Sequence, residues 1–233
     1  MLHSCLLKQR ALTNHLPTGG VPTLIQNPST YSTGALGTSL VYTLPATPVN
    51  GHPILIGVCG SLAPTLSISD NGATSGAWVL VKAFNASTEQ LKVYKKIAGG
   101  DETTITITAS ASAYMSVKYY ETTGSGNIEN INANYVSSAS SPVSFGPLVA
   151  PTQPNAIPLM FFGWRKTNAA AGGGGDSVTS PWLLSPPPIV VNDAISSAYQ
   201  LNPPGSGVSG TISYTDTVRN GNAFTWIGFF LDP

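Results

Sequence analysis

The sequence predicts an all-β protein, an antiparallel, jelly-roll-like β-sandwich with an extended N-terminal arm. Three observations predict this fold. Short runs of alternating or β-branched apolar residues recur at a spacing of about ten residues. Turn signals rich in Gly, Asn, Asp and Pro separate these runs. No long segment shows the apolar period of an amphipathic helix, and the nearest approach is SCLLKQRALTNHL near the start.

The runs of the first half are expected to form consecutive antiparallel strands. Residues 52–61, HPILIGVCGS, are almost continuously apolar, which is typical of a strand buried on both faces. Residues 103–110, TTITITAS, alternate strictly, which is typical of a strand with one buried face. A turn signal at Asp70-Asn71-Gly72 ends another run. The predicted strands are 39–44, 52–61, 65–70, 77–84, 89–97, 103–110 and 113–122.

The second half continues the pattern with longer loops. Its predicted strands are 156–164, 189–201, 210–218 and 223–231. Within 189–201, a short helix at NDAISSAY is the alternative to a strand. The Ser- and Asn-rich residues 122–151 have two interpretations, a linker or a pair of short strands.

We expect an arm over residues 1–37 and a single sandwich domain over residues 38–233. The arm is rich in Pro, Gly, Ser and Thr and cannot form a core of its own, so we expect it to contact another subunit. One sandwich is preferred to two because the second half offers too few predicted strands to close a separate core. No repeat of fixed period is found.

Charge is scarce in this chain. Asp, Glu, Lys and Arg make up 9% of the 233 residues, and the net charge is zero, whereas roughly a quarter of an ordinary soluble domain is charged. This balance argues against nucleic-acid binding and against a polybasic membrane-surface protein. No transmembrane segment and no convincing signal peptide are predicted. The low charge indicates either a surface covered by partner proteins or the Ser/Thr-rich surface of a secreted β protein.

The residue types that carry most catalysis and metal binding form no recognisable pattern, so we predict no enzyme, no cofactor and no metal. Cys5 and Cys59 do not form a zinc pattern, and two free thiols are expected rather than a disulfide. His3, His15 and His52 lack the spacing of metal ligands.

The carboxylates and serines also lack the spacing of a catalytic or calcium-binding motif. Asp101 and Glu102 are adjacent and are expected on a solvated turn. Calcium binding at Asp70 with Asn71, or at Asp176, lacks the spacing of known calcium loops. No Gly-x-Ser-x-Gly nucleophile motif is present.

A run of four glycines lies in NAAAGGGGDSV, residues 168–178. It lacks the Gly-Lys-Ser/Thr ending of a phosphate-binding loop and is not Gly-x-Gly-x-x-Gly between a strand and a helix. An anion bound there would meet the carboxylate of Asp176. We therefore predict a flexible connector at this position.

The tryptophans supply the one candidate ligand contact. Trp78, Trp164 and Trp226 lie in strand-like runs and are expected in the core. Trp182 lies in loop-like sequence and is the one whose setting allows an exposed face. Exposed indoles stack on sugars while Asp side chains bind hydroxyls, so Trp182 and Asp176 are the candidate contacts. Between a stacking platform and a packed indole, we expect Trp182 to be packed.

A resemblance covers about residues 50–125. SISDNGATSGAWVLVKAF, followed by LKVYKKIAGGDETTITITASASAYMSVKYYETTG, is similar to a pattern of β-sandwich structural proteins of tailed bacteriophages. In that pattern, a turn after Asp and Gly leads to a Trp strand, a Tyr-Lys strand, a Thr-x-Thr-x-Thr strand and a strand ending near Tyr-Glu. These motifs are structural, and the resemblance carries over no functional residue.

The resemblance implies a virion protein. We expect a non-enzymatic capsid decoration, or cement, protein on the outer capsid surface, binding the major capsid protein or other virion proteins. A homo-oligomer is expected, and the family analogy favours a trimer. The alternative is a carbohydrate-binding or receptor-binding adhesin of a tail or a cell surface.

Overall fold

The structure, a computed structural model, confirms the all-β class, since its described residues form antiparallel strands and no helix. No described helix could therefore cross a membrane. Cys5, His3, His15 and the glycine run at 172–175 lie outside the described residues. The structure describes residues 20–28, 31–32, 35–74, 76–86, 88–137, 141–165, 176–185, 193–201, 204, 206–214 and 223–233.

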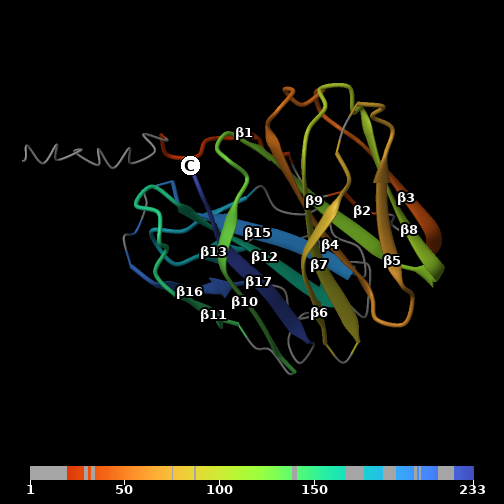
Figure 1. Cartoon of the computed structure of the whole chain (residues 1–233). Coiled ribbons are helices and arrows are strands. Elements are labelled where there is room, and N and C mark those ends of the chain that lie inside the picture. The colour runs from red at the N-terminus through yellow and green to blue at the C-terminus, as the bar shows by residue number, and fades with distance from the viewer. Residues whose placement is uncertain are drawn as a thin grey trace, which may run out of the picture.

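The first half of the chain forms two antiparallel sheets, A and B (Figure 1). Sheet A contains, in spatial order, β1 (Leu24–Gln26), β9 (Met115–Thr122), β4 (Pro53–Ser61), β7 (Glu89–Ile97) and β6 (Val79–Asn85). The short β2 (Tyr31–Ser32) also pairs with β9. Sheet B contains β3 (Gly37–Thr43), β8 (Thr104–Ala113) and β5 (Leu66–Asp70).

The second half forms sheets C and D. Sheet C contains β10 (Ile128–Val136), β17 (Phe224–Leu231), β12 (Ile157–Arg165), β15 (Asp193–Tyr199) and β14 (Leu183–Leu184). Sheet D contains β11 (Val143–Leu148), β16 (Val208–Ser213) and β13 (Ser177–Val178). The stretch 122–151 thus contains a pair of strands, and the alternative of a helix at NDAISSAY is wrong because β15 occupies it.

The two halves share one topology. Sheet A runs β1-β9-β4-β7-β6 and sheet C runs β10-β17-β12-β15-β14, which is the same order with each strand replaced by its counterpart. Sheets B and D correspond in the same way, as β3-β8-β5 and β11-β16-β13. A tryptophan stands directly before the edge strand of each larger sheet, Trp78 before β6 and Trp182 before β14. The chain is therefore built as two sandwiches of the same design.

This architecture corrects the prediction of one sandwich over residues 38–233. The second half supplies eight strands and encloses a buried cluster of its own. Two of its strands, β13 and β14, are only two residues long and lie among Ser and Pro residues. Such short strands are too brief to show an alternating pattern, so the sequence pattern could not reveal them.

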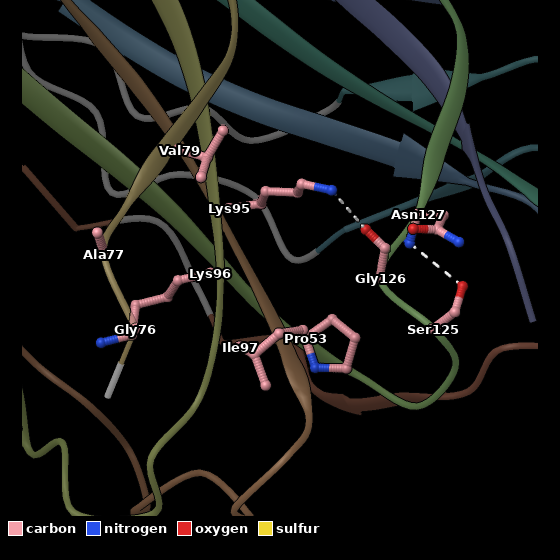
Figure 2. Close-up of a pocket in the computed structure, with 10 residues that line it drawn as sticks. All are labelled: Pro53, Gly76, Ala77, Val79, Lys95, Lys96, Ile97, Ser125, Gly126 and Asn127. Carbon is pink, nitrogen blue, oxygen red and sulfur yellow. Dashed lines mark hydrogen bonds between the residues drawn. The ribbon is translucent and has the colours of Figure 1, made fainter. Parts of the chain in front are cut away.

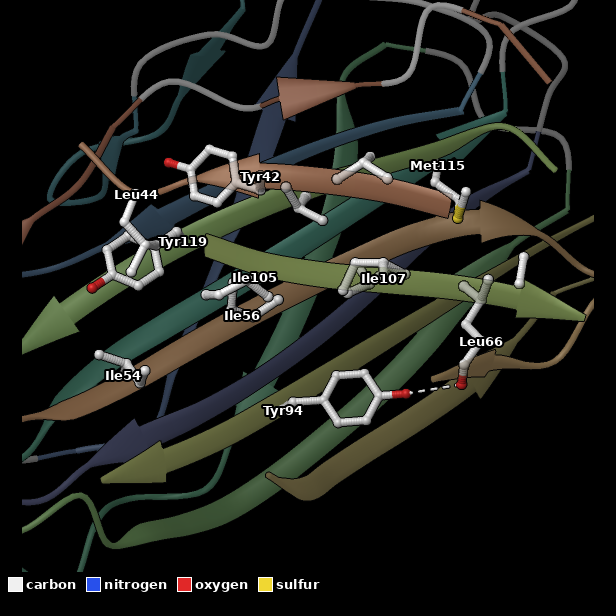
Figure 3. Close-up of a cluster of buried hydrophobic side chains, with 14 of the residues drawn as sticks. Tyr42, Leu44, Ile54, Ile56, Leu66, Tyr94, Ile105, Ile107, Met115 and Tyr119 are labelled. Carbon is white, nitrogen blue, oxygen red and sulfur yellow. Dashed lines mark hydrogen bonds between the residues drawn. The ribbon is translucent and has the colours of Figure 1, made fainter. Parts of the chain in front are cut away.

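Three buried cores hold four layers together in the order B, A, C, D. The first core lies between sheets A and B and includes Ile54, Ile56 and Tyr119 (Figure 3). The second lies between sheets C and D and is rich in aromatic residues. The third, which we call the seam, lies between sheets A and C. Because sheet A has a core on each face, β4 is buried on both sides, which explains its continuous apolar run.

Part of the predicted arm belongs to the first sandwich. The β1 strand pairs with β9 at Leu24–Thr122 and Gln26–Glu121, and β2 pairs with it at Tyr31–Val117. Residues 1–19 of the arm lie outside the described residues. Cys59 is buried in the seam.

Candidate functional site

Trp182 is a packed core residue. Its side chain is only 4% exposed, and its Nε1 donates a hydrogen bond to the carbonyl of Ser209 at 3.1 Å. Its ring meets the edge of Phe145 at a centroid distance of 5.1 Å. The expectation of a packed indole is confirmed, because Trp182 belongs to the buried core between sheets C and D. Trp182 is therefore unable to act as a surface platform for a sugar ring.

A shallow hollow of about 420 Å³ lies on sheet D above Trp182. Gly210 forms part of its lining, and a Cβ at that position would come within 2.9 Å of the indole Nε1. The polar side chains of the hollow are all hydroxyls, from Ser144, Thr179, Ser209 and Thr211. Such a surface offers hydrogen bonds without charge.

Asp176, the other sequence candidate, lies immediately before β13. It is half-buried and already interacts with another part of the chain. The hollow is lined by Thr179 and not by Asp176. The structure thus places both candidates on the same short stretch of the second sandwich, but it does not join them in one ligand site.

A second pocket, of about 310 Å³, opens where the two halves meet (Figure 2). Apolar side chains of Pro53, Val79 and Ile97 line it together with the loop at 125–127 that leads into the second half. Lys95 reaches across from β7, and its Nζ donates to the carbonyl of Gly126 at 2.9 Å. The pocket combines an apolar wall with Lys95, which is already hydrogen-bonded, and Lys96, whose ammonium group is paired with Asp70 and Glu102.

Glu129 near the start of β10 and Asp232 just after β17 form a pair of neighbouring carboxyl groups. Glu129 accepts hydrogen bonds from the amide and hydroxyl of Thr152, at 2.8 and 2.6 Å. Burial and the neighbouring carboxylate of Glu129 raise the pKa of Asp232 to about 6. Lys95 opposes this rise only in part. Below about pH 6 the protonated carboxyl group of Asp232 can therefore hydrogen-bond to Glu129, which links the end of the chain to β10.

Residues of the first half build a buried ion cluster between the turn at 70–72 and the end of β7. The Nζ of Lys96 lies 2.7 Å from Asp70 and 3.0 Å from Glu102, and all three side chains are almost fully buried. The Nε1 of Trp78 donates to Asp70 at 2.6 Å. Burial raises the pKa of Glu102, but the Gly99 amide and Lys96 outweigh it and lower the pKa to about 2. The expectation of a solvated turn is wrong for Glu102, which is 0% exposed.

This cluster is structural, because its polar groups satisfy one another. Asp70, one of the candidate calcium ligands, forms an ion pair with Lys96 and accepts a hydrogen bond from Trp78. Asn71 is committed to the amides of Thr103 and Thr104 at the end of sheet B. Among the described residues, no group of three or more His, Cys, Asp or Glu side chains is placed to hold a metal ion. The cluster thus locks a turn and does not form a reactive centre.

The outer faces of the two outer sheets are uncharged. On sheet B, rows of exposed side chains cross the strands in register, such as Ser39–Thr108–Ser67 and Val41–Thr106–Ser69. On sheet D, Ser144 and Thr211 are register partners on the outer side. The described strands of both sheets place no charged side chain on these faces. Sequence reasoning missed these faces, although the Thr-x-Thr-x-Thr run was the signal for the first.

No family model, curated protein or solved structure matches this chain.

Proposed function

We propose that this protein is a non-enzymatic structural component of a bacteriophage particle, specifically a decoration protein on the outer capsid surface. The observation that carries the proposal is the pair of uncharged outer faces, on sheets B and D. Burying a charged group against a neighbour has a large desolvation cost, whereas hydroxyl and apolar groups lose little when they can form hydrogen bonds. These faces are therefore suited to close packing against other subunits.

Two further features support a structural role. The residues of the phage-like motif form the ion cluster around Lys96, as expected of a motif kept for its fold. Charged residues are few over the whole chain, at 9%, which agrees with the depletion of charge in interface cores. We extend the proposal to a homotrimer by the family analogy.

The adhesin alternative has less support. It depended on an exposed aromatic platform, and Trp182 is 4% exposed with a satisfied indole N–H. A glycan array with the purified protein tests it directly. Binding of a glycan that is retained in a Trp182→Phe variant would favour the hollow on sheet D as its site.

The experiment that tests the proposed function is an attachment assay on particles purified from a culture that produces this protein. Thr106 stands at the centre of the outer face of sheet B, so Thr106→Lys places a charge in the proposed contact. Val149→Lys is the matched control, because Val149 is 73% exposed and lies outside both faces. We expect wild type and Val149→Lys to attach equally and Thr106→Lys to lose attachment, unless sheet D supplies the contact.

The corresponding variant on sheet D completes the assay. Ser209→Lys adds a charge to the hollow on the outer face of that sheet. Attachment that survives both Thr106→Lys and Ser209→Lys would contradict the proposal, and so would the absence of wild-type protein from the particles. Light scattering of the purified protein tests the trimer, which a monomer at particle-like concentrations would contradict.

A further inference from the structure

Lys118 is a buried amine in the seam. It lies on β9, is 0% exposed, and is among the largest fully buried side chains. Its Nζ donates to the carbonyl of Pro28 and lies 5.4 Å from the ring centroid of Tyr120. None of the ion pairs formed by the described residues includes it. A buried lysine without a carboxylate is costly, so its presence needs a reason beyond packing.

The second sandwich shows that the fold does not need a lysine here. The strand β17 is the counterpart of β9 and points Ile227, Phe229 and Leu231 into the seam. Alternation along β9 points Lys118 and Tyr120 into the same space. An apolar residue at the position of Lys118 would thus satisfy the packing, as it does on β17.

The partner of Lys118 belongs to a segment that crosses both halves. We call residues 23–28 with 31–32 the N-terminal strap. Thr23 and Thr123 exchange two hydrogen bonds, both at 2.9 Å. The side chain of Gln26 donates to Glu121, and Asn27 accepts from the hydroxyl of Ser185 at 2.6 Å. Since Ser185 follows β14, the strap is fixed to the first sandwich and to the second at once.

The strap is also the counterpart of a much longer strand. Sheet C has the nine-residue β10 beside β17, paired with it along most of its length. In the described part of sheet A, the three residues of β1 and the two of β2 lie beside β9. The strap is therefore held by fewer ladder bonds than β10, and the contact of Lys118 with Pro28 lies between its two short strands. A change in the charge of Lys118 therefore affects the strap between its two short pairings with β9.

Burial lowers the pKa of Lys118 to about 7. The neutral amine can donate to the Pro28 carbonyl while buried. The ammonium form requires water, because a single carbonyl and one ring do not replace its hydration. The strap covers this amine, so moving the strap aside is the direct way to hydrate it.

We propose that Lys118 is a proton-operated latch on the N-terminal strap: the neutral amine holds the strap closed, and protonation favours its release from β9. Release frees the outer edge of β9, whose backbone groups then become available to a strand of another chain. The proposal does not depend on the proposed virion role, because it concerns the closed and open states of one chain.

Other titratable groups around this site must be separated from Lys118. Tyr120 and Tyr199 face the same side of the seam, and burial raises the pKa of Tyr120. On the opposite face of β9, the Nδ1 of His52 lies 2.8 Å from Glu121, which also holds Gln26. His52→Gln is therefore the control variant that separates this neighbouring group from Lys118.

Hydrogen exchange of the full chain, measured between pH 5 and pH 8.5 and corrected for the intrinsic exchange rate, tests the latch. The strap and β9 peptides of the wild type should lose protection by up to about tenfold per pH unit as the pH falls from 8.5 to 7, where the covered amine is neutral and the hydrated amine is charged, and protection should level off below pH 7. In Lys118→Met this slope should disappear. Lys82→Met removes an exposed lysine from β6 and should keep the wild-type slope.

The possible outcomes separate the effect of Lys118 from that of His52. Protection of the wild-type strap that does not change with pH would overturn the latch. This test needs no variant, so it holds even if a variant does not fold. A slope that survives Lys118→Met and vanishes in His52→Gln would also overturn it. If Lys118→Met does not fold, Lys118→Ile copies the residue that β17 carries in the seam and replaces it in the comparison.

Discussion

At the scale of single residues, buried polar groups in this protein are held by specific partners that the sequence did not reveal. Asp70, Lys96 and Glu102 are separated by 32 positions along the chain and meet in one cluster. Of the three, Glu102 was expected on a solvated turn, and Lys96 was expected within a strand. The pairing could not be predicted, because it depends on how the end of β5 and the end of β7 approach each other in three dimensions.

Trp182 gives the first prediction at this scale. Trp182→Ala removes a packed indole and leaves a cavity beneath Gly210, so it should destabilise the protein by about 3–5 kcal/mol. Trp182→Phe keeps most of the packing and should cost clearly less. Urea denaturation measures both free energies of unfolding. An alanine variant as stable as the wild type would show that the indole does not pack as described.

Asp232 gives a prediction about pH. Its pKa in the folded state is raised to about 6 by burial and by Glu129, above the ordinary value of 3.8. A carboxyl group with a raised pKa adds stability that is complete below pH 3.8 and is lost as the pH rises through 6. Asp232→Asn should remove this decline, which falls between about pH 4 and pH 6, in chemical denaturation. An unchanged decline in the variant would assign it to another group.

At the scale of elements, the sequence predicted strands well where burial falls on alternate residues or on a whole run. The β8 strand, Thr104–Ala113, contains the alternating TTITITAS run, and β4 contains the continuous apolar run. Prediction failed for β13 and β14, which are two residues each. Such strands exist because neighbouring strands hold them in place, so their own residues carry almost no pattern.

The close approach of sheets A and C gives the prediction at this scale. A Cβ on Gly57 of β4 would lie 2.3 Å from a ring atom of Phe161 across the seam. Gly57→Ala should therefore force the sheets apart locally and destabilise the protein by about 1–3 kcal/mol. Gly76→Ala is the control, because a Cβ there meets nothing within 4 Å. Equal stability of the two variants would contradict the seam geometry.

At the scale of the whole molecule, the chain is two sandwiches of one topology joined by a buried seam. The all-β class was predictable from strand spacing, but the duplication was not. The halves differ in how they fill their cores, with an ion cluster around Lys96 in the first and stacked aromatic rings in the second. Because the two halves fill their cores with different residue types, their common topology leaves no repeated pattern in the sequence.

The seam predicts how the whole molecule unfolds. Because the seam buries large side chains from both halves, such as Tyr120 of the first and Phe161 and Phe229 of the second, neither half is expected to remain folded once the other unfolds. Thermal unfolding should therefore be one transition, with equal calorimetric and van't Hoff enthalpies. Two separated transitions would indicate sandwiches that fold independently and a seam that contributes little.

The most direct measurement of the proposed function is cryo-electron microscopy of purified particles from a culture that produces this protein. We expect density for the protein on the outer capsid surface, with the uncharged outer face of sheet B or sheet D packed against a neighbouring subunit. Particles without this protein, or with the protein attached while both outer faces stay open to solvent, would contradict the proposed decoration role.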